Sequence, residues 1–479
     1  MIRSSRDVVI VGGSLRAEMA GGDLGDRRLN ARRDRVLDVL EQDPAAGFPA
    51  ACADDSATEA LYRFLRNPRV SLDRVLEPHL VATTERARAV GEIVVIHDTT
   101  EASFAGEHAR HGLAKLGPRR HGFLIHTALA VSADGLRAPL GVLALAPFVR
   151  RPDPTRLVKP HWRERFNDPE KESRRWAAGV GRGRQRLGAA VRAIHVMDRE
   201  GDNYELLSAL IPHGDRFVIR LHYDRQLITT GPPDAPATIL AARPQTVLCE
   251  RPIAVSTRQV GTRPRPAVVK RPAHASRTAT VRFAAAAVTL KRPRDHRQPM
   301  PPALAVHVVY AWEPDPPAGE VPIEWRLVTT APIDTVEQVL QIVEWYRTRW
   351  LIEEFFKCLK TGCAYEQRQL ESLDTLLVAL ALLAPIAWQR LLMRHLARAR
   401  PDVDATVVVT VRQIAILRTT PGGKALAAIP SVRDALRVVA RLGGHLRQNG
   451  EPGWLVLTRG MQKLRVMETG WAASEAAKM

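Results

Sequence analysis

The sequence has little cysteine. Its four cysteines, at positions 52, 249, 358 and 363 of 479 residues, are too few and too irregularly spaced for a disulfide scaffold or a paired CxxC zinc site. A chain with so few cysteines is typical of a reducing compartment, and we expect a cytoplasmic setting.

Long apolar runs are also missing. The most apolar stretch, residues 376–388, has 13 residues and contains Pro385, so it falls short of the roughly 20 residues that span a bilayer and predicts a buried helix. Near the N-terminus, DVVIVGG is too short for a secretory core of about 7–15 residues, and its glycines form no GxGxxG motif after a strand. We therefore expect neither a membrane partner nor a nucleotide cofactor.

Acidic residues are too few to balance the basic ones. The chain has 70 Lys and Arg against 51 Asp and Glu, which gives a formal charge of +19. Such an excess favours a polyanionic partner. At 45% hydrophobic residues the chain can build ordinary cores, which excludes a disordered basic tail protein, and its length suits about three domains.

More than half of the net charge falls in one stretch. Residues 251–300 contain twelve Lys or Arg and the single acid Asp295, a balance of +11. The runs TATVRFAAAAVTLKR and ALAVHVVYAW in and after this stretch are β-branched and apolar, and Pro-rich turns flank them. We predict a β-rich basic unit over about 224–322, with a merely solvated basic surface as the alternative.

Two buried strands are predicted to end at an aspartate. Asp98 follows the run IVVIH, and Asp198 follows AIHVM. At the tip of a core strand the backbone is rigid while the side chain can face a cleft, which suits a metal ligand. An aspartate that only caps a turn is the alternative at each position.

Helical periodicity marks three further segments. Residues 334–362 predict one long amphipathic helix that ends at Gly362. The region from Leu24 to about residue 69 predicts two helices, with Ser56 as an N-cap and Glu59 at the capping-box position.

The long helix carries an unusual set of polar residues. Tyr346, Arg349, Glu353 and Lys360 are 3, 4 and 7 residues apart and project within a sector of about 60° on an ideal helix. Arginine and lysine can bind phosphates while a glutamate reaches a metal ion, so this face suits a site on a phosphate backbone. A solvated face with an Arg349–Glu353 ion pair is the alternative, and Glu354 projects away as a structural residue.

Together these residues resemble a known family, the DDE transposases of the insertion-sequence-4 family. The family signature Tyr-x2-Arg-x3-Glu-x6-Lys is matched within WYRTRWLIEEFFKCLKTG. The two aspartate motifs are similar to IHDTT and DREGD, where Gly201 replaces the usual alanine. Similar blocks are LGDRRLNAR, YRFLRNPRVS, EKESRRW and ARLGGHL, so the likeness extends from about residue 23 to the end.

The resemblance implies an α/β fold with an RNase H-like catalytic core and a β-rich insertion, flanked by a helical N-terminal DNA-binding domain and a helical C-terminal dimerisation domain. It implies that Asp98, Asp198 and Glu353 form the catalytic, metal-binding triad. Hard Mg²⁺ prefers such carboxylates, with Mn²⁺ as a substitute, and two ions per site are expected.

The resemblance also implies DNA contacts. Tyr346, Arg349 and Lys360 would hold the DNA backbone, and Trp325 would stack on a flipped base, with a core tryptophan in the strand IEWRLV as the alternative. Arg220 matches a family arginine near the active site, although it could be a plain strand arginine. The charge pattern adds the clusters Arg27, Arg28, Arg32, Arg33 and Arg263, Arg265, Lys270, Arg271.

Four segments follow from this organisation. Residues 1–22 are an unmatched extension, 23–75 a helical domain that recognises DNA ends, 76–379 the catalytic domain with its insertion at about 224–322, and 380–479 a helical dimerisation domain. The expected partners are double-stranded DNA, as transposon ends and target, and a second copy of the chain. When bound to DNA, the protein would lie at the bacterial nucleoid.

The expected activity is cut-and-paste transposition with cleavage, hairpin formation and joining of the 3′ ends to target DNA. Two alternatives stay open: a catalytically silent DNA-binding inhibitor of transposition, and a metal-dependent nuclease on the same fold. Retention of all three acidic residues argues against the first, and Trp325 with a C-terminal dimerisation block argues against the second.

Overall fold

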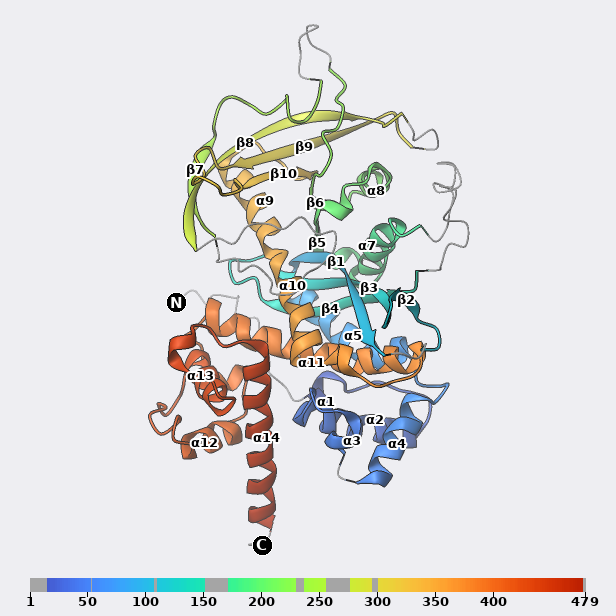
Figure 1. Cartoon of the computed structure of the whole chain (residues 1–479). Helices are drawn as coiled ribbons and strands as arrows, with labels where there is room; N and C mark the ends of the chain where they lie inside the picture. Colours follow the sequence, from blue (N-terminus) through green and yellow to red (C-terminus); the bar gives the residue numbers. More distant parts are fainter. Residues whose placement is uncertain are drawn as a thin grey trace. The chain divides into compact units, whose positions relative to one another are not determined.

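The computed structural model describes residues 15–52, 54–106, 110–150, 171–229, 237–255, 276–294 and 300–476. The chain divides into two compact units (Figure 1). Unit 1 contains Met1–Lys159, Gly179–Arg192 and Trp350–Met479, and unit 2 contains Pro160–Ala178 and Ala193–Arg349. The division of the sequence into the functional segments 1–22, 23–75, 76–379 and 380–479 stays a prediction.

Unit 1 begins with helices. These are α1 (Leu15–Glu18), α2 (Arg27–Gln42), α3 (Phe48–Ala51), α4 (Asp55–Leu65) and α5 (Leu72–Val90). The side chain of Asp54 caps α4 by accepting a hydrogen bond from the Ala57 N–H, so the predicted cap at Ser56 is wrong by two residues. Aspartate and serine are about equally good caps, and the earlier acidic residue starts the helix.

Antiparallel strands follow in unit 1. Its strands are β1 (Glu92–Ala105), β2 (Ala114–Gly117), β3 (Arg120–Ser132) and β4 (Pro139–Phe148), with β3 pairing to each of the others. β1 pairs with β3 from Ile93 opposite Ser132 to Ala105 opposite Arg120. The prediction that the first strand ends at Asp98 is therefore wrong, because β3 supplies hydrogen-bonding partners for seven further residues.

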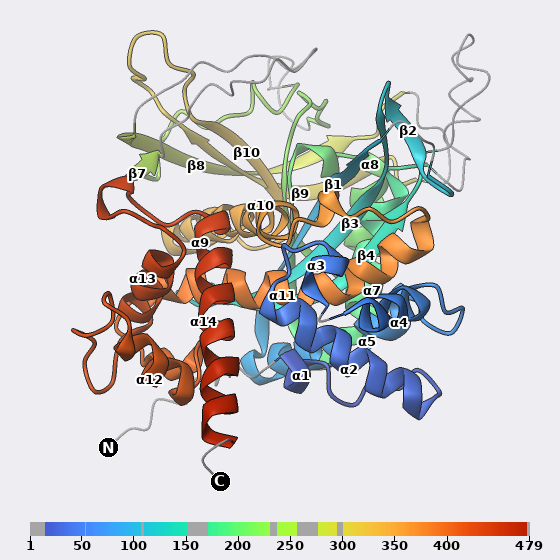
Figure 2. The same cartoon turned by 60° about the horizontal axis from the view of Figure 1, so that its bottom comes forward.

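The C-terminal part of unit 1 is helical. It contains α10 (Trp350–Lys357), a π-helical turn η4 (Cys358–Gly362), α11 (Leu373–Ala399), α12 (Val411–Thr419), α13 (Val432–Leu442) and α14 (Trp454–Ala476). In Figure 2, α2 lies beside α11 and α14, and both pairs are in contact. By length and composition α11 could cross a membrane, but 89% of its most apolar window is buried within the protein. The predicted buried helix at residues 376–388 is confirmed within α11.

Two glycines allow α13 and α14 to approach closely. A Cβ added to Gly443 would lie 1.9 Å from the Val456 carbonyl oxygen, and one added to Gly460 would lie 1.9 Å from the Val439 carbonyl oxygen. Glycine is therefore required on both sides of this contact, because any side chain would overlap with backbone atoms.

Unit 2 is built on a mixed sheet. Strands β5 (Arg192–Met197) and β6 (Arg216–Arg220) are parallel, and β6 pairs antiparallel with β10 (Glu324–Thr329). Antiparallel pairing continues through β9 (Ala303–Trp312), β8 (Arg277–Lys291) and β7 (Cys249–Val255). The structure confirms the two strands predicted in and after the basic stretch, which are β8 and β9. It also confirms the strands predicted before Asp98 and Asp198, which are β1 and β5.

The helices of unit 2 are α8 (Tyr204–Leu210) and α9 (Val336–Thr348), while α7 (Arg174–Leu187) is divided between the units. Thr335 and Gln338 form a capping box that starts α9. The predicted single helix over 334–362 is interrupted at Arg349, where the backbone N–H donates to Tyr346 with the closer spacing of a 3₁₀ turn. Its end at Gly362 is confirmed, although the last turn is π-helical.

Candidate functional site

Asp98 lies in β1 where the burial of the strand changes. Residues 93–97 are buried, whereas 98–101 are partly exposed. Asp98 Oδ1 accepts a hydrogen bond from the Thr99 N–H (2.7 Å). The preceding His97 is fully buried and stacks on His126, with ring centroids 5.6 Å apart and planes 22° apart. A partly exposed carboxylate is therefore attached to a rigid, buried support.

Glu353 lies in α10, which packs against β1 within unit 1. Like Asp98, Glu353 is partly exposed and follows a fully buried residue, Ile352. The structure therefore brings the strand of Asp98 and the helix of Glu353 into contact.

Lys360 holds this arrangement from the π-helical turn. Its Nζ donates to the carbonyl oxygen of Glu101 at 2.5 Å and lies 3.3 Å from Glu366 Oε1. The same Glu366 oxygen accepts a hydrogen bond from the Ser103 N–H at 3.0 Å. Glu101 and Ser103 belong to β1, so these contacts tie the segment after Glu353 to the strand of Asp98. Glu101 and Glu366 carry no motif that the sequence could have revealed.

Glu354 has the structural role that the helical projection predicts. It is 9% exposed, and its carboxylate pairs with Arg394 Nη1 at 2.7 Å and with Lys357 Nζ at 3.2 Å. The Arg394 guanidinium also lies 4.5 Å from the centroid of the Trp454 ring. Glu354 thereby connects α10 to α11 and α14.

Asp198 directly follows β5 in unit 2, as predicted. Its Oδ1 caps a short 3₁₀ helix, η2 (Arg199–Gly201), by accepting from the Glu200 N–H at 2.8 Å. Asp198 is partly exposed while the preceding Met197 is buried. Asp198 therefore caps a turn, as the alternative interpretation predicts, and its side chain still lies at the surface of the unit.

The last acid of the DREGD motif is buried instead. Asp202 is 5% exposed; it pairs with Arg225 and accepts hydrogen bonds from the backbone N–H groups of His222 (2.7 Å) and Tyr223 (2.9 Å). These contacts fix the chain after β6, so Asp202 has a structural role.

The donor set suits a hard divalent cation. Asp98, Asp198 and Glu353 offer carboxylate oxygens, the ligands that Mg²⁺ and Mn²⁺ prefer. Across the described part of the chain, no three His, Cys, Asp or Glu side chains come together as they would around a metal ion. The structure places Asp98 and Glu353 in unit 1 and Asp198 in unit 2.

Tyr346 and Trp325 meet in unit 2. Tyr346 is only 6% exposed on α9, and its ring centroid lies 5.6 Å from that of the partly exposed Trp325 on β10. Arg220 Nη2 donates to the Glu324 carbonyl oxygen at 2.8 Å, so it too lies near the start of β10. Trp325 is in the strand that the alternative predicts, yet its ring is not enclosed in the core. Arg349 is partly exposed after α9.

The N-terminal arginines divide into two groups. Arg27 and Arg28 are exposed and Arg32 is partly exposed on α2. Arg33 is 5% exposed and donates to the Gly22 carbonyl oxygen at 2.6 Å and to Asp34 Oδ1 at 2.9 Å. The structure thus gives Arg33 internal contacts, and the DNA contacts expected of the four arginines stay a prediction. Arg263, Arg265, Lys270 and Arg271 lie outside the described residues.

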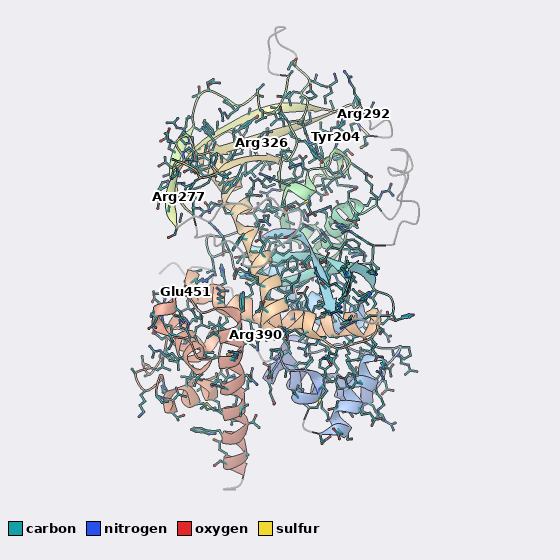
Figure 3. The ribbon with its side chains drawn as sticks, viewed as in Figure 1. Tyr204, Arg277, Arg292, Arg326, Arg390 and Glu451 are labelled. Atoms are coloured by element: carbon teal, nitrogen blue, oxygen red, sulfur yellow. The ribbon has the colours of Figure 1, made fainter. Side chains whose placement is uncertain are left out.

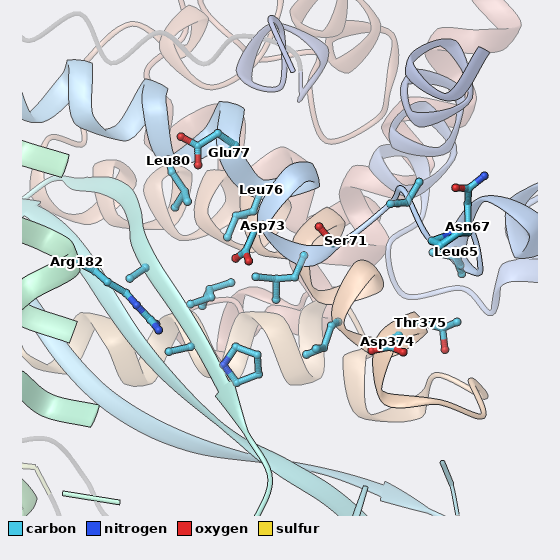
Figure 4. A pocket seen from close by; sticks show the side chains of 18 of the residues that line it. Leu65, Asn67, Ser71, Asp73, Leu76, Glu77, Leu80, Arg182, Asp374 and Thr375 are labelled. Carbon is cyan, nitrogen blue, oxygen red and sulfur yellow. The ribbon is translucent and has the colours of Figure 1, made fainter. Parts of the chain in front are cut away.

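The largest cavity described, about 1160 Å³, lies within unit 1 (Figure 4). Figure 4 shows Asp73, Leu76 and Glu77 on α5 and Arg182 on α7 at its wall. Its charges are mixed, and Arg186 Nη2 pairs with Glu77 at 2.7 Å. Since none of the predicted catalytic residues lines this cavity, size alone does not identify the site.

Two protein-family profiles match the chain. One, described as transposase DNA-binding, matches residues 13–70, which include the arginines of α2. The other, described as transposase DDE domain, matches residues 183–388 and contains Asp198 and Glu353, while Asp98 precedes it.

A solved structure is also similar, the cryo-EM structure of a piggyBac transposase synaptic complex with hairpin DNA. The identity is 10%, the TM-score is 0.32, and the match covers 81% of this chain and 73% of that one. At this TM-score the likeness carries no argument about fold or mechanism. The two profile matches carry the assignment: the chain contains a transposase DNA-binding segment followed by a transposase DDE domain, which supports a DNA transposase.

Proposed function

We propose that the protein is a cut-and-paste DNA transposase of the insertion-sequence-4 family, similar to the transposase of composite transposon five, with an RNase H-like core. One observation carries the proposal: the Lys360 contacts to Glu101 and Glu366 fasten the helix of Glu353 to the strand of Asp98. A binding-only protein would have no use for two partly exposed carboxylates on elements held together in this way.

Asp98, Asp198 and Glu353 would hold two divalent ions, Mg²⁺ or Mn²⁺. When bound, such ions supply Lewis-acid polarisation of the phosphodiester. The rigid, buried neighbours of the three carboxylates keep the ligands in place, which lowers the cost of organising the site.

The reaction would proceed by in-line displacements at phosphorus. Water attacks at the transposon end and frees a 3′-OH; this 3′-OH attacks the opposite strand, giving a hairpin and releasing the flanking DNA. A second water opens the hairpin, and the 3′-OH then attacks target DNA. Each step exchanges one P–O bond for another, so no covalent enzyme intermediate is needed.

Basic side chains would hold the DNA during these steps. Lys360 has three N–H donors, of which Glu101 and Glu366 use two, leaving one for a phosphate oxygen. Arg349 and Arg220 would add contacts to the backbone, and Trp325, already beside Tyr346, would receive a flipped base. Arg27, Arg28 and Arg32 on α2 would bind the end sequence.

The test is incubation of linear DNA carrying the element's terminal repeats with Mg²⁺, comparing the wild type with Asp198→Ala. We expect nicks, hairpins and strand transfer from the wild type only. Equal cleavage by both proteins would refute the metal-site assignment, and binding without cleavage by the wild type would identify a silent DNA-binding protein. Cleavage without hairpins or strand transfer would identify a nuclease. Trp325→Ala should slow hairpin formation more than first nicking.

A further inference from the structure

The sheet of unit 2 has a second polar face, opposite the one that carries Trp325. Glu324 pairs with Trp312 and Arg326 with Tyr310 between β10 and β9, so these four residues share one face. Trp325 pairs with Ala311 on the other face, where its ring meets Tyr346. Trp325 also contributes to the lining of the cavity described next, so a group bound there would lie beside the proposed base-stacking site.

This face contains a cavity of about 130 Å³. Its lining includes Arg243, Trp312, Glu324 and Arg326, together with Trp325. The Tyr310 hydroxyl donates to the Ile239 carbonyl oxygen at 2.9 Å, which fixes the segment that bears Arg243 against the strands. The volume is roughly four times the ~30 Å³ that a water molecule occupies in the liquid, which is enough for a phosphate group.

Arg326 lines this cavity and carries an unsatisfied donor. Its Nη1 is buried and has no hydrogen-bond partner in the described part of the chain. Buried polar groups are almost always paired, so an unpaired guanidinium nitrogen needs an explanation. Figure 3 labels Arg326 on the strands of this sheet.

Arg243 supplies a second cation. Its guanidinium lies 4.8 Å from the centroid of the Trp312 ring, a stacking geometry that leaves the edge N–H groups available. Arg225, Arg277 and Arg282 of this unit pair with carboxylates, whereas neither Arg243 nor Arg326 joins an ion pair within the described residues. Burial raises the pKa of Tyr310 to about 12; the charges of Arg326 and Arg243 oppose this rise, and the charge of Asp224 adds to it.

We propose that Arg326 and Arg243 bind a backbone phosphate of DNA in this cavity, with Trp312 orienting Arg243. Guanidinium forks match phosphate oxygens and bind them through charge-assisted hydrogen bonds. Among the lining residues, Arg243 and Arg326 outnumber the single acid Glu324 by one charge, which favours an anionic group. This inference takes its partner, DNA, from the proposed function. The phosphate-binding chemistry of the two arginines does not depend on that function.

The test measures binding of a mixed-sequence DNA duplex in EDTA over ~50 to ~200 mM NaCl. Loss of one neutralised phosphate should reduce the slope of log K against log salt by about 0.9. Because the two guanidinium groups share one phosphate, we expect this full reduction when Arg326→Gln and Arg243→Gln are combined and a smaller reduction for each single variant, with equal weakening on every sequence. Trp312→Leu should weaken binding less than Arg243→Gln, because the cation stays.

Arg282→Gln is the matched control. It removes one positive charge from the strand beside β9, but Arg282 is already paired with Glu250. Its slope should equal that of the wild type. Unchanged slopes for both cavity variants, with wild-type melting temperatures, would overturn the proposal, as would equal reductions in all three arginine variants. Because no metal is present, the result is independent of cleavage: failure of catalysis alone would refute the proposed function and leave this site standing.

Discussion

At the scale of single residues, the adjacent glutamates Glu353 and Glu354 of α10 are expected to have different roles, one in activity and one in stability. We expect Glu353→Gln to abolish Mg²⁺-dependent cleavage of end DNA while the melting temperature stays at the wild-type value, because the side chain is partly exposed. Glu354→Gln should destabilise the protein by about 1–3 kcal/mol, since it leaves Arg394 without its carboxylate partner.

Paired measurements of cleavage and thermal melting check both variants. Activity per folded molecule should persist in Glu354→Gln. A stable Glu353→Gln protein that still cleaves would contradict the ligand assignment.

His79 makes the stability of unit 1 dependent on pH. It is fully buried; its Nε2 accepts a hydrogen bond from the Val142 N–H at 3.0 Å, so the ring is neutral and Nδ1–H donates to Glu18 at 2.6 Å. Burial lowers the pKa of His79 although the Glu18 hydrogen bond opposes this. For Glu18, burial raises the pKa, but the hydrogen bonds from His79 and Arg86 outweigh it and lower the pKa overall.

Both shifts have the same consequence for stability. A group whose pKa is lower in the folded state takes up protons on unfolding, so its stabilisation is present above the unfolded pKa and is lost as pH falls. The loss should begin below about pH 6.5 for His79 and continue below about pH 4.5 for Glu18. Melting temperatures measured from pH 8 to pH 5 should fall less steeply for His79→Gln than for the wild type; parallel curves would exclude this role.

Sequence motifs identified the individual acids of the candidate site but not their partners. Asp98, Asp198 and Glu353 were reached through local runs and spacing, whereas Lys360 contacts Glu101 across 259 residues of chain. No local pattern encodes such a contact. The arginines of α2 look alike in the sequence, and only the fold separates the buried Arg33 from the exposed Arg27 and Arg28.

At the scale of elements, the contact between α13 and α14 depends on glycine. We expect Gly460→Ala to destabilise unit 1 by about 1–3 kcal/mol, because a Cβ there would overlap with the Val439 backbone and force the helices apart. Gly470→Ala, in the same helix with nothing within 4 Å of the added Cβ, is the matched control and should stabilise by about 0.5–1 kcal/mol.

Chemical denaturation of both variants checks this prediction. Destabilisation of equal size at the two positions would mean that helix geometry alone, and not the close contact, decides the effect.

Strands were predicted better than helix ends. The runs that became β8 and β9 are long, apolar and β-branched, and the structure follows them closely. β1 runs past Asp98 because β3 pairs with it throughout, and the residues Thr99 and Thr100 favour a strand as well. No proline or glycine lies at the interruption near Arg349. The helical periodicity therefore predicted one helix where the structure has two, α9 and α10.

At the scale of the whole molecule, we expect two copies of the chain to associate on paired end DNA. The C-terminal helix α14 carries exposed apolar side chains at Val466, Met467 and Trp471. Such side chains are unfavourable in water and support a contact with a second copy. Val466→Asp should therefore prevent dimer formation on DNA while single DNA ends still bind.

Gel filtration with and without end DNA checks this prediction. Val81→Asp, at an exposed apolar position on α5, is the control and should still dimerise. A wild-type complex that stays monomeric at saturating DNA would contradict the dimer.

Because unit 1 is discontinuous in sequence, its parts fold together in a definite order during synthesis. It combines Met1–Lys159 with Trp350–Met479, while most of unit 2, Ala193–Arg349, is one continuous stretch. A chain leaving the ribosome N-terminus first can therefore complete the strands of unit 2 before α10 exists to pack against β1. The strand of Asp98 gains its partner helix only after about three quarters of the chain has been synthesised, so prematurely terminated chains would carry the arginines of α2 without bringing together Asp98 and Glu353, the metal ligands that we propose.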